Sequence, residues 1–447
     1  MTAATPRAAR RRSVHGRARL VTALLVAGTL ALAACSSGDD EAATTTTGSG
    51  AADPAGTIVV GEGATSNISI DTSTDGTIVA AAWYELNDET GVERSLVATS
   101  TDGGATFGEP VVVDEPSTQD PQVAVNDDGT ILVGALTYDA ERLVDPDDSL
   151  SWPGWMVLFR SDDEGRTFEQ VADLEDQIGE RMLTLTEPPG MAASADGRTI
   201  MFAWQDRTPA ELLGAGEPVP GEDTVARPVW ASVSTDAGET FSTPRAVAPS
   251  SCGCCRIEAF VAGDAPGVAY RGLQPVDPTH DERDPELVQA DAAGNFAEPV
   301  EISDDAYVLP LDGCPASGPG VASADGTTHV AWWTEVDGEA GWWYATGPDG
   351  GPFGEPVALP ADPTISYSVE LALDAEGTSW ITGTNWDVPE HHLLVWEVPA
   401  DGDPTAVEDQ FVPLSSATEG FDVAGLPTGA AVAWLYEGDV KVRLVGT

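Results

Sequence analysis

An eight-residue motif occurs three times in this chain and limits the folds that the chain can adopt. It reads STDGGATF at residues 100–107, SDDEGRTF at 161–168 and STDAGETF at 234–241. The aspartate can accept hydrogen bonds from the backbone of its own turn, and the glycine two residues later can adopt a positive φ. Each motif is therefore predicted to be a structural turn, centred on Asp102, Asp163 and Asp236.

A longer unit surrounds each motif. A short strand, an Asp-Gly turn and an apolar strand that often ends in Ala-Trp precede it, and a strand of the type FGEPV follows it. Hairpins of this kind occur seven times, at residues 78–83, 131–136, 200–204, 267–270, 329–333, 379–386 and 430–434. Short strands that repeat with regular turns are typical of a ring of β-sheet blades.

The SxDxGxTF pattern is the Asp-box signature, and on these three motifs the chain resembles the sialidase-like (BNR, Asp-box) β-propeller superfamily. The resemblance covers residues 57–447 and implies an all-β propeller of four-stranded blades. The hairpin count predicts seven blades, and six, as in sialidases, is the alternative. The last repeat is one strand short, so residues 57–60 are expected to pair beside residues 440–445 and close the ring.

Residues 1–35 have the pattern of a bacterial lipoprotein signal peptide. Six arginines precede an apolar stretch at residues 20–34, and LAAC ends at Cys35. We expect export, cleavage before Cys35, attachment of diacylglycerol to its thiol, and an extracytoplasmic protein lipid-anchored to the bacterial cell membrane. An ordinary signal peptide is the alternative. Residues 36–56 contain few apolar side chains of any size and are predicted to be a flexible tether.

The charge of the chain excludes two classes of partner. Six of the 20 basic residues precede Cys35 and none of the 74 acidic residues does, which leaves 14 basic against 74 acidic residues, a formal charge of −60. Nucleic acid and anionic membrane surfaces would be repelled by such a field, so membrane contact is expected only through the N-terminal lipid. We expect a monomer. The sequence contains no GxGxxG, Walker, HExxH or GxSxG motif.

Four further cysteines are grouped. Cys252, Cys254 and Cys255 lie within four residues, and Cys314 takes the place of Cys252 in the next repeat. We predict one cluster at the mouth of the central channel, on the face opposite the Asp boxes. Disulfides, with a bridge to Cys314, are the first interpretation in an exported protein. A copper(I) or zinc site and a redox pair are the alternatives. No other cofactor is indicated, and the extra metal ligands would be His280, His391 and His392.

The same face carries the candidate ligand-binding residues, which are Arg256, Arg271, Arg283, Asp284 and Tyr270. Sialidases hold the carboxylate of their substrate with three arginines, so the resemblance implies a clamp of this kind. Arginine binds carboxylates through two parallel hydrogen bonds. The family's Arg-Ile-Pro motif is replaced by NISI at residues 67–70, and the three arginines belong to one repeat. The alternative is that they form local ion pairs with structural roles.

These features together predict a surface lipoprotein whose propeller binds an extracellular ligand, with carbohydrate the expected class, on its cysteine-bearing face. Processing of that ligand is left open, and no catalytic residue is assigned. A sialidase-type glycoside hydrolase is the main alternative, and an extracytoplasmic metal or thiol-redox protein is the second. A scaffold that only makes protein contacts is the last.

The anchor can be tested by replacing Cys35 with serine. Because the lipid is attached to the thiol, the Cys35→Ser protein is expected to leave the membrane fraction, whereas the unchanged protein stays there. Immunoblotting of membrane and aqueous fractions measures the distribution. Recovery of the variant in membranes would contradict the lipoprotein assignment.

Overall fold

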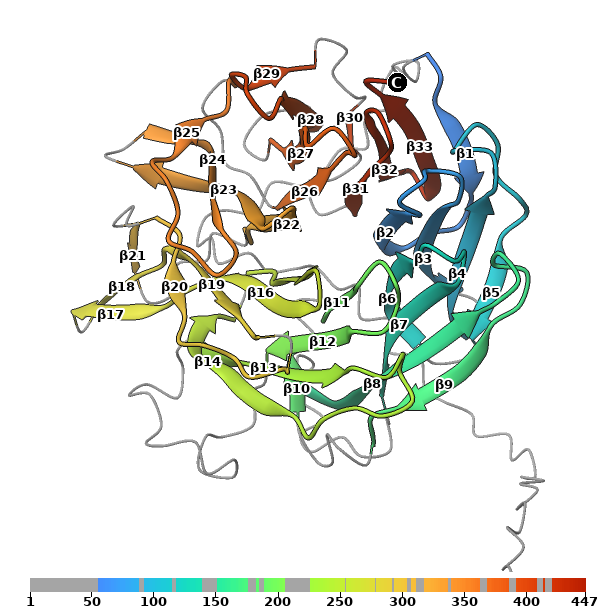
Figure 1. Cartoon of the computed structure of the whole chain (residues 1–447), viewed down its shortest axis with the longest axis horizontal. Coiled ribbons are helices and arrows are strands. Elements are labelled where there is room, and N and C mark those ends of the chain that lie inside the picture. Colours follow the sequence, from blue (N-terminus) through green and yellow to red (C-terminus); the bar gives the residue numbers. More distant parts are fainter. Residues whose placement is uncertain are drawn as a thin grey trace, which may run out of the picture. The chain divides into compact units, whose positions relative to one another are not determined.

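The computed structural model describes residues 55–87, 92–114, 118–138, 151–175, 182–184, 189–205, 226–253, 255–277, 279–291, 293–303, 307–310, 317–336, 339–361, 368–385, 391–407, 413–414 and 420–447. The predicted signal peptide, Cys35 and nearly all of the predicted tether lie outside these residues. So do Cys254 and Cys314. The described strands form an all-β propeller of seven four-stranded blades (Figure 1).

Each blade is an antiparallel meander whose first strand lies innermost. Blade 1 consists of β2 (Ser66–Thr72), β3 (Val79–Asn87), β4 (Val92–Ser100) and β5 (Val111–Asp114). Blade 2 consists of β6 (Thr118–Val125), β7 (Ile131–Tyr138), β8 (Ser151–Ser161) and β9 (Glu169–Asp173), with β10 (Met182–Thr184) added to the start of β8. Blade 3 consists of β11 (Gly190–Ala193), β12 (Ile200–Gln205), β13 (Ala226–Ser234) and β14 (Arg245–Cys252).

The chain continues in the same way through the second half of the ring. Blade 4 consists of β15 (Glu258–Ala262), β16 (Ala265–Arg271), β19 (Pro285–Gln289) and β20 (Val300–Glu301). Blade 5 consists of β22 (Gly320–Ala324), β23 (Thr327–Val336), β24 (Glu339–Pro348) and β25 (Val357–Ala358). Blade 6 consists of β26 (Val369–Leu373), β27 (Ser379–Thr384), β28 (His391–Val398) and β29 (Thr405–Ala406), with β30 (Pro413–Leu414) beside β28.

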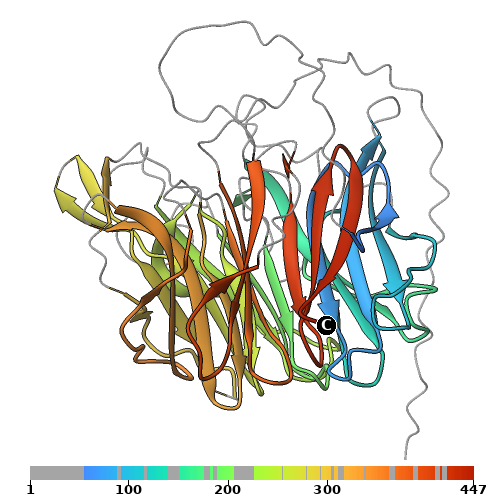
Figure 2. The same cartoon turned by 90° about the horizontal axis from the view of Figure 1, so that it is seen from above.

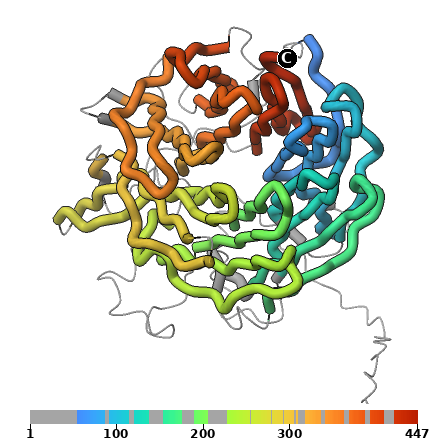
Figure 3. The backbone as a smooth tube through the Cα atoms, viewed as in Figure 1, coloured from blue at the N-terminus to red at the C-terminus, as the bar shows by residue number. Residues whose placement is uncertain are grey.

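Blade 7 joins the two ends of the described chain. Its strands are β31 (Phe421–Gly425), β32 (Ala430–Tyr436), β33 (Asp439–Val445) and, outermost, β1 (Ile58–Gly61). Ile58 pairs with Val442 and Val59 with Lys441 in an antiparallel register, and Figure 3 shows the blue strand beside the red one. The prediction of seven blades closed by the terminal strands is confirmed, and the six-blade alternative is wrong.

The apolar core lies between the blades. In the described residues the buried apolar side chains form seven clusters, and each cluster joins two neighbouring blades. Alternate residues of a strand point to opposite faces, so a strand with a neighbour on both sides must be apolar along its whole length. β32 (AAVAWLY) has this composition, with Ala433 at the blade 1 interface and Trp434 at the blade 6 interface. The Ala-Trp pairs of the sequence therefore mark the middle of blades.

The Asp boxes are the turns between the third and fourth strands of blades 1 to 3. In the first box Asp102 Oδ1 accepts from Ser100 Oγ (2.8 Å) and from Thr106 N (2.8 Å), while Oδ2 accepts from Thr106 Oγ1 (2.6 Å). Gly104 has a φ of +82°. Asp163 and Asp236 make the same contacts. The predicted structural role of the motif is observed in all three copies.

The ring has two different ends, which Figure 2 shows in side view. The turn face carries the Asp boxes and the turns between first and second strands. The mouth face is the opposite end, where every inner strand begins. The insertion at residues 271–284 adds a small sheet on this face, made of β17 (Gln274–Asp277), β18 (His280–Glu282) and β21 (Val308–Pro310). No helix among the described residues has the length and apolar character needed to cross a membrane.

Closure can be tested with two adjacent valines of β1. Val60 is 6% exposed and packs in the cluster between blades 7 and 1, whereas Val59 on the same strand is 50% exposed. Val60→Ala is expected to lower the free energy of unfolding by about 2 kcal/mol, because it removes two buried methyl groups and leaves a void. The matched control Val59→Ala should change it by less than about 0.5 kcal/mol. Denaturant titration measures both, and equal effects would contradict the orientation of β1.

Candidate functional site

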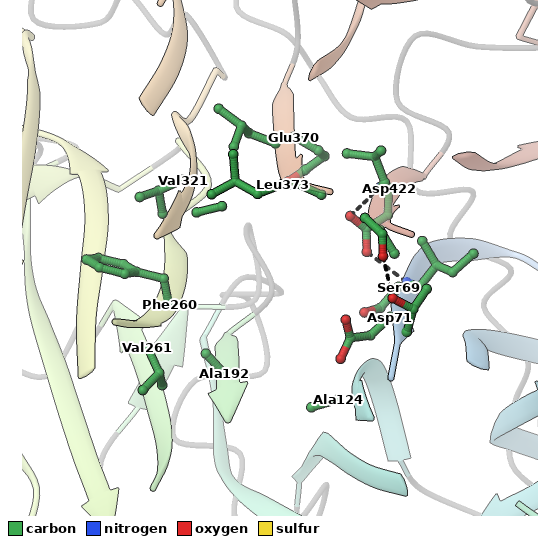
Figure 4. Close-up of a pocket in the computed structure, with 18 of the residues that line it drawn as sticks. Ser69, Asp71, Ala124, Ala192, Phe260, Val261, Val321, Glu370, Leu373 and Asp422 are labelled. Atoms are coloured by element: carbon green, nitrogen blue, oxygen red, sulfur yellow. Dashed lines mark hydrogen bonds between the residues drawn. The ribbon is translucent and has the colours of Figure 1, made fainter. Parts of the chain in front are cut away.

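A central channel runs between the inner strands. It has a volume of about 450 Å³ and is lined by residues from β2, β6, β11, β15, β22, β26 and β31, one strand from each blade. Figure 4 shows that its two sides differ. Glu370, Asp422 and Asp71 lie together on one side, and the apolar side chains of Phe260 and Val261 lie on the other. The acidic residues that line the channel are the candidate site.

Three acidic residues stand at the start of inner strands, at the mouth of the channel. Glu258 is the first residue of β15, Glu370 the second of β26 and Asp422 the second of β31. Their neighbours Ile257, Val369 and Phe421 are buried between blades. Because strand side chains alternate, the acidic residue that follows each of them points toward the next blade, and at this end of the strand it lines the channel.

One cation lies among these carboxyl groups. Arg256 Nη1 is 2.9 Å from Glu370 Oε1, and both side chains are largely buried. Burial raises the pKa of Glu370, and Arg256 opposes that rise. Burial and the nearby Glu370 raise the pKa of Glu258 well above its usual range, and the same two causes raise the pKa of Asp422 to about 8. The mouth therefore holds an ion-paired carboxylate beside two carboxyl groups that keep their protons near neutral pH.

Two channel carboxyls also join neighbouring blades. Asp422 Oδ2 accepts a hydrogen bond from Ile70 N (2.8 Å), which links blade 7 to blade 1. Asp71 Oδ2 accepts from Val125 N (2.7 Å), which links blade 1 to blade 2. Burial raises the pKa of Asp71 to about 6. Asp71 and Asp422 thus satisfy backbone donors of inner strands that do not pair with each other as a sheet.

Two of the six described non-glycine residues with a positive φ lie at the mouth between blades 1 and 2. Asn67 and Asp120 have φ values of 47° and 50°, a region that residues other than glycine rarely adopt. Each lies at a register shift near the start of its inner strand, and Asn67 Nδ2 donates to Asp120 Oδ1. Burial raises the pKa of Asp120 to about 6. Strained residues that are held by each other are typical of binding sites.

The structure gives the five ligand-binding candidates different sets of contacts. Arg256 alone has an ion pair with a channel residue. Arg271 is 1% exposed, and its guanidinium donates to the backbone carbonyls of Ser317, Arg283 and Trp333. Tyr270 Oη donates to Glu286 Oε2 (2.6 Å).

The last two candidates are also buried. Arg283 is fully buried, with Nη2 3.8 Å from Asp281 Oδ2 and Nη1 3.6 Å from Cys252 Sγ. Asp284 Oδ1 accepts from Tyr307 N (3.1 Å). These contacts tie β16, β19 and the small sheet to blade 5, so they favour the structural alternative for Arg271 and Arg283 and leave Arg256 as the candidate ligand-binding arginine.

Cys252 lies at the mouth end of β14, and Cys255 follows it. The Asp236 box precedes the other end of the same strand. Cys252 and Cys255 are buried, and their sulfur atoms are 2.7 Å apart. Cys254 and Cys314 lie outside the described residues, so the predicted bridge to Cys314 stays a prediction. Within the described part of the chain no three His, Cys, Asp or Glu side chains are grouped as metal ligands. His280 contacts Asp277 and Thr279.

Reasoning from the sequence identified Arg256 but assigned no role to Asp71, Asp120, Glu258, Glu370 or Asp422. The signal that would find them is the register of each hairpin. Glu258 pairs with Ala269, and Asp422 pairs with Ala433. Both alanines precede the aromatic residue of an Ala-Trp or Ala-Tyr pair, so alignment of the hairpins on this pair brings Glu258 and Asp422 to equivalent positions.

Comparisons with known proteins add a likeness of fold. No protein-family model matches the chain, and no curated protein sequence matches it. An ulvan lyase structure is 13% identical, covers 87% of this chain and 96% of its own, and has a TM-score of 0.48. A Hadza microbial sialidase is 12% identical over 79% of this chain and 73% of its own, with a TM-score of 0.46.

An α-L-arabinofuranosidase of Fusarium graminearum, solved with arabinobiose, is 13% identical over 77% of this chain and 97% of its own, with a TM-score of 0.46. With TM-scores below 0.5, these likenesses carry no argument about the fold or the substrate of this chain. The seven-bladed ring itself follows from its strand pairing.

The raised pKa of Asp422 makes stability depend on pH. The carboxyl has a pKa of about 8 in the folded chain and about 3.9 when unfolded. The stability that it contributes is complete below about pH 4 and is lost as the pH rises through 8. Between about pH 5 and pH 9 the Tm of Asp422→Asn should therefore rise relative to that of the unchanged protein.

Asp102→Asn is the control for this experiment. Hydrogen bonds from Thr106 and Ser100 lower the pKa of Asp102, so that carboxyl does not titrate in this range. Its Tm difference should stay constant with pH. Scanning calorimetry measures both variants, and a Tm difference for Asp422→Asn that does not change with pH would contradict the buried, protonated state.

Proposed function

We propose that the chain binds an uncharged glycan at the mouth of its channel and hydrolyses a glycosidic bond there. The observation that carries the proposal is the group Glu258, Glu370 and Asp422 around Arg256. Glycoside hydrolysis needs a protonated carboxyl to donate to the leaving oxygen and an ionised carboxylate beside it. Environments that push the pKa values of neighbouring carboxyls apart supply both forms at one pH.

The contacts suggest a role for each residue. Glu370 is the ion-paired member, so it is the group expected to lose its proton first and to act as base or nucleophile. Glu258 and Asp422 are the groups expected to stay protonated, because each is buried and also close to Glu370. Asp422 is also held by two backbone N–H groups, from Ile70 and Val423. Glu258 is therefore the proposed proton donor. Asp422, which is held by the backbone, has a structural role beside it.

The charge of the site selects the class of glycan. A polyanionic sugar would meet three carboxyl groups in a chain with a formal charge of −54 and one arginine at the mouth, Arg256, which already pairs with Glu370. An uncharged sugar avoids this repulsion, and its hydroxyl groups can donate to carboxylate oxygens. This favours a neutral substrate over the sialic acid that the sialidase alternative requires. Lipid anchoring at Cys35 remains part of the proposal.

A panel of chromogenic glycosides tests the activity. We expect turnover of at least one neutral glycoside and none of a sialoside. Glu258→Gln and Glu370→Gln should each lower kcat by about 10²-fold or more, because each removes a proton-transfer group. Glu286→Gln, which changes the glutamate that accepts from Tyr270 outside the channel, is the matched control and should retain activity.

The contrary results are distinct. Saturable binding of a neutral glycan without turnover would overturn the hydrolase and leave a glycan-binding protein. Turnover of the sialoside would overturn the substrate class. If the panel gives neither binding nor turnover, the whole proposal is wrong. Circular dichroism of each variant separates loss of activity from loss of fold.

A further inference from the structure

The connection between blades 3 and 4 brings two thiols together. β14 ends at Cys252, and Cys255 N donates to Cys252 O (3.0 Å), so the chain turns back on itself within four residues. Cys255 Sγ donates to Cys252 Sγ at 2.7 Å, with both side chains fully buried. The geometry points to a reversible dithiol–disulfide couple of Cys252 and Cys255 whose oxidation state controls the placement of Arg256 at the channel mouth.

The residues around the turn hold the two sulfur atoms in place. Gln205 Nε2 donates to Ser251 Oγ and to Cys252 O, both at 2.9 Å. Ser251 Oγ donates to Arg227 O (2.7 Å), and Ser250 Oγ donates to Leu273 O (2.8 Å). A disulfide bond is about 2.0 Å long, so the sulfurs must approach by less than about 1 Å. The surrounding hydrogen bonds can remain while the bond forms.

The charges beside the pair favour Cys252 as the nucleophile. Arg283 Nη1 is 3.6 Å from Cys252 Sγ, and a guanidinium stabilises the thiolate form. Burial and the neighbouring Cys252 raise the pKa of Cys255 well above its usual range. The Cys252 thiolate therefore attacks first and Cys255 resolves the intermediate.

A small disulfide such as oxidised glutathione supplies the oxidant, and it reaches the buried Cys252 when the connection between blades 3 and 4 opens locally. Cys252 displaces one glutathione thiolate and forms a mixed disulfide with the other half. Cys255 then gives up its proton, attacks the sulfur of Cys252 and releases the second glutathione. The two protein thiols lose two electrons and two protons, and the glutathione disulfide becomes two thiols.

The couple is linked to the channel by the chain itself. Arg256 follows Cys255 directly, and the Arg256 carbonyl packs against Gly318, where there is no room for a Cβ. Its guanidinium then reaches Glu370 of blade 6. A bond that closes a loop of four residues restrains the unfolded chain less than one that closes a long loop. The bond is therefore better suited to setting a local conformation than to stabilising the whole fold.

The couple is tested in the full chain with Cys35→Ser, Cys254→Ser and Cys314→Ser, so that the two thiols of interest remain. The protein is brought to constant composition in reduced and in oxidised glutathione, starting from both forms, then quenched in acid, denatured, alkylated and weighed by mass spectrometry. We expect two alkylated thiols in reduced buffer and none in oxidised buffer, reversibly. Two alkylated thiols in both buffers would overturn the couple.

Two further substitutions in this background test which thiol reacts. With Cys255→Ser, oxidised glutathione should remain attached to Cys252, because no resolving thiol is present. With Cys252→Ser, attachment to Cys255 should be at least about tenfold slower, since burial holds the pKa of the Cys255 thiol well above its usual range. Equal rates would contradict the assigned roles. The unsubstituted chain is treated in the same way. Its tryptic peptide 246–256 contains Cys252 and Cys255 and shows whether the substitutions themselves changed the reactivity of the pair.

Hydrogen exchange tests the link to Arg256 without reference to any glycan. Peptides that cover residues 256–262 and 368–373 should exchange at rates that differ by about threefold or more between the oxidised and reduced proteins. The peptide 439–445 of blade 7 is the control and should not change. Formation of the disulfide with no change in the first two peptides would leave the couple in place and overturn its control of Arg256.

Discussion

The burial of both faces of every blade is the constraint on which the structure depends. A single four-stranded sheet of this composition has two apolar faces, and neither can be left in water. The seven clusters of buried side chains lie between blades rather than within one central core. A blade is therefore stable only between two neighbours, and the ring satisfies this requirement for all seven blades. The channel is what remains at the axis, where inner strands converge without pairing.

The mouth face shows how a very acidic chain places its few buried cations. Arg271 gives its guanidinium to three carbonyl groups from separate segments, and Arg283 spans Asp281 and Cys252. Arg271 links blade 4 and its insertion to blade 5, and Arg283 links the insertion to the end of β14 in blade 3. Arg256 differs because its partner is a carboxylate in the channel. Two of the three arginines of this repeat therefore have structural contacts, and Arg256 alone of the three is assigned to the chemistry of the site.

The sequence predicts most of the architecture, because its signals are local and repeated. The Asp boxes fix the turn after the third strand of blades 1 to 3, the Ala-Trp pairs mark second strands, and the missing strand of the last repeat leads to the pairing of β1 with β33. The site is harder to predict, since Glu258, Glu370 and Asp422 belong to three blades and are separated by more than 100 residues in the first case. Each looks like an ordinary acidic residue at the edge of a strand. Only the register of the inner strands shows that they meet.

Closure through blade 7 also determines when the fold can be completed as the chain is made. Ile58 is near the start of the propeller and Val442 is near its end, so β1 has no partner until almost the whole chain has emerged. Until then blade 7 is incomplete. The faces of blades 1 and 7 that pack together in the final ring are both exposed to solvent. Blade 1 must therefore remain able to pack against blade 7 until synthesis of the chain is nearly complete. Removal of a few residues from the C-terminus would therefore remove the pairing of β33 with β1 and leave the ring open.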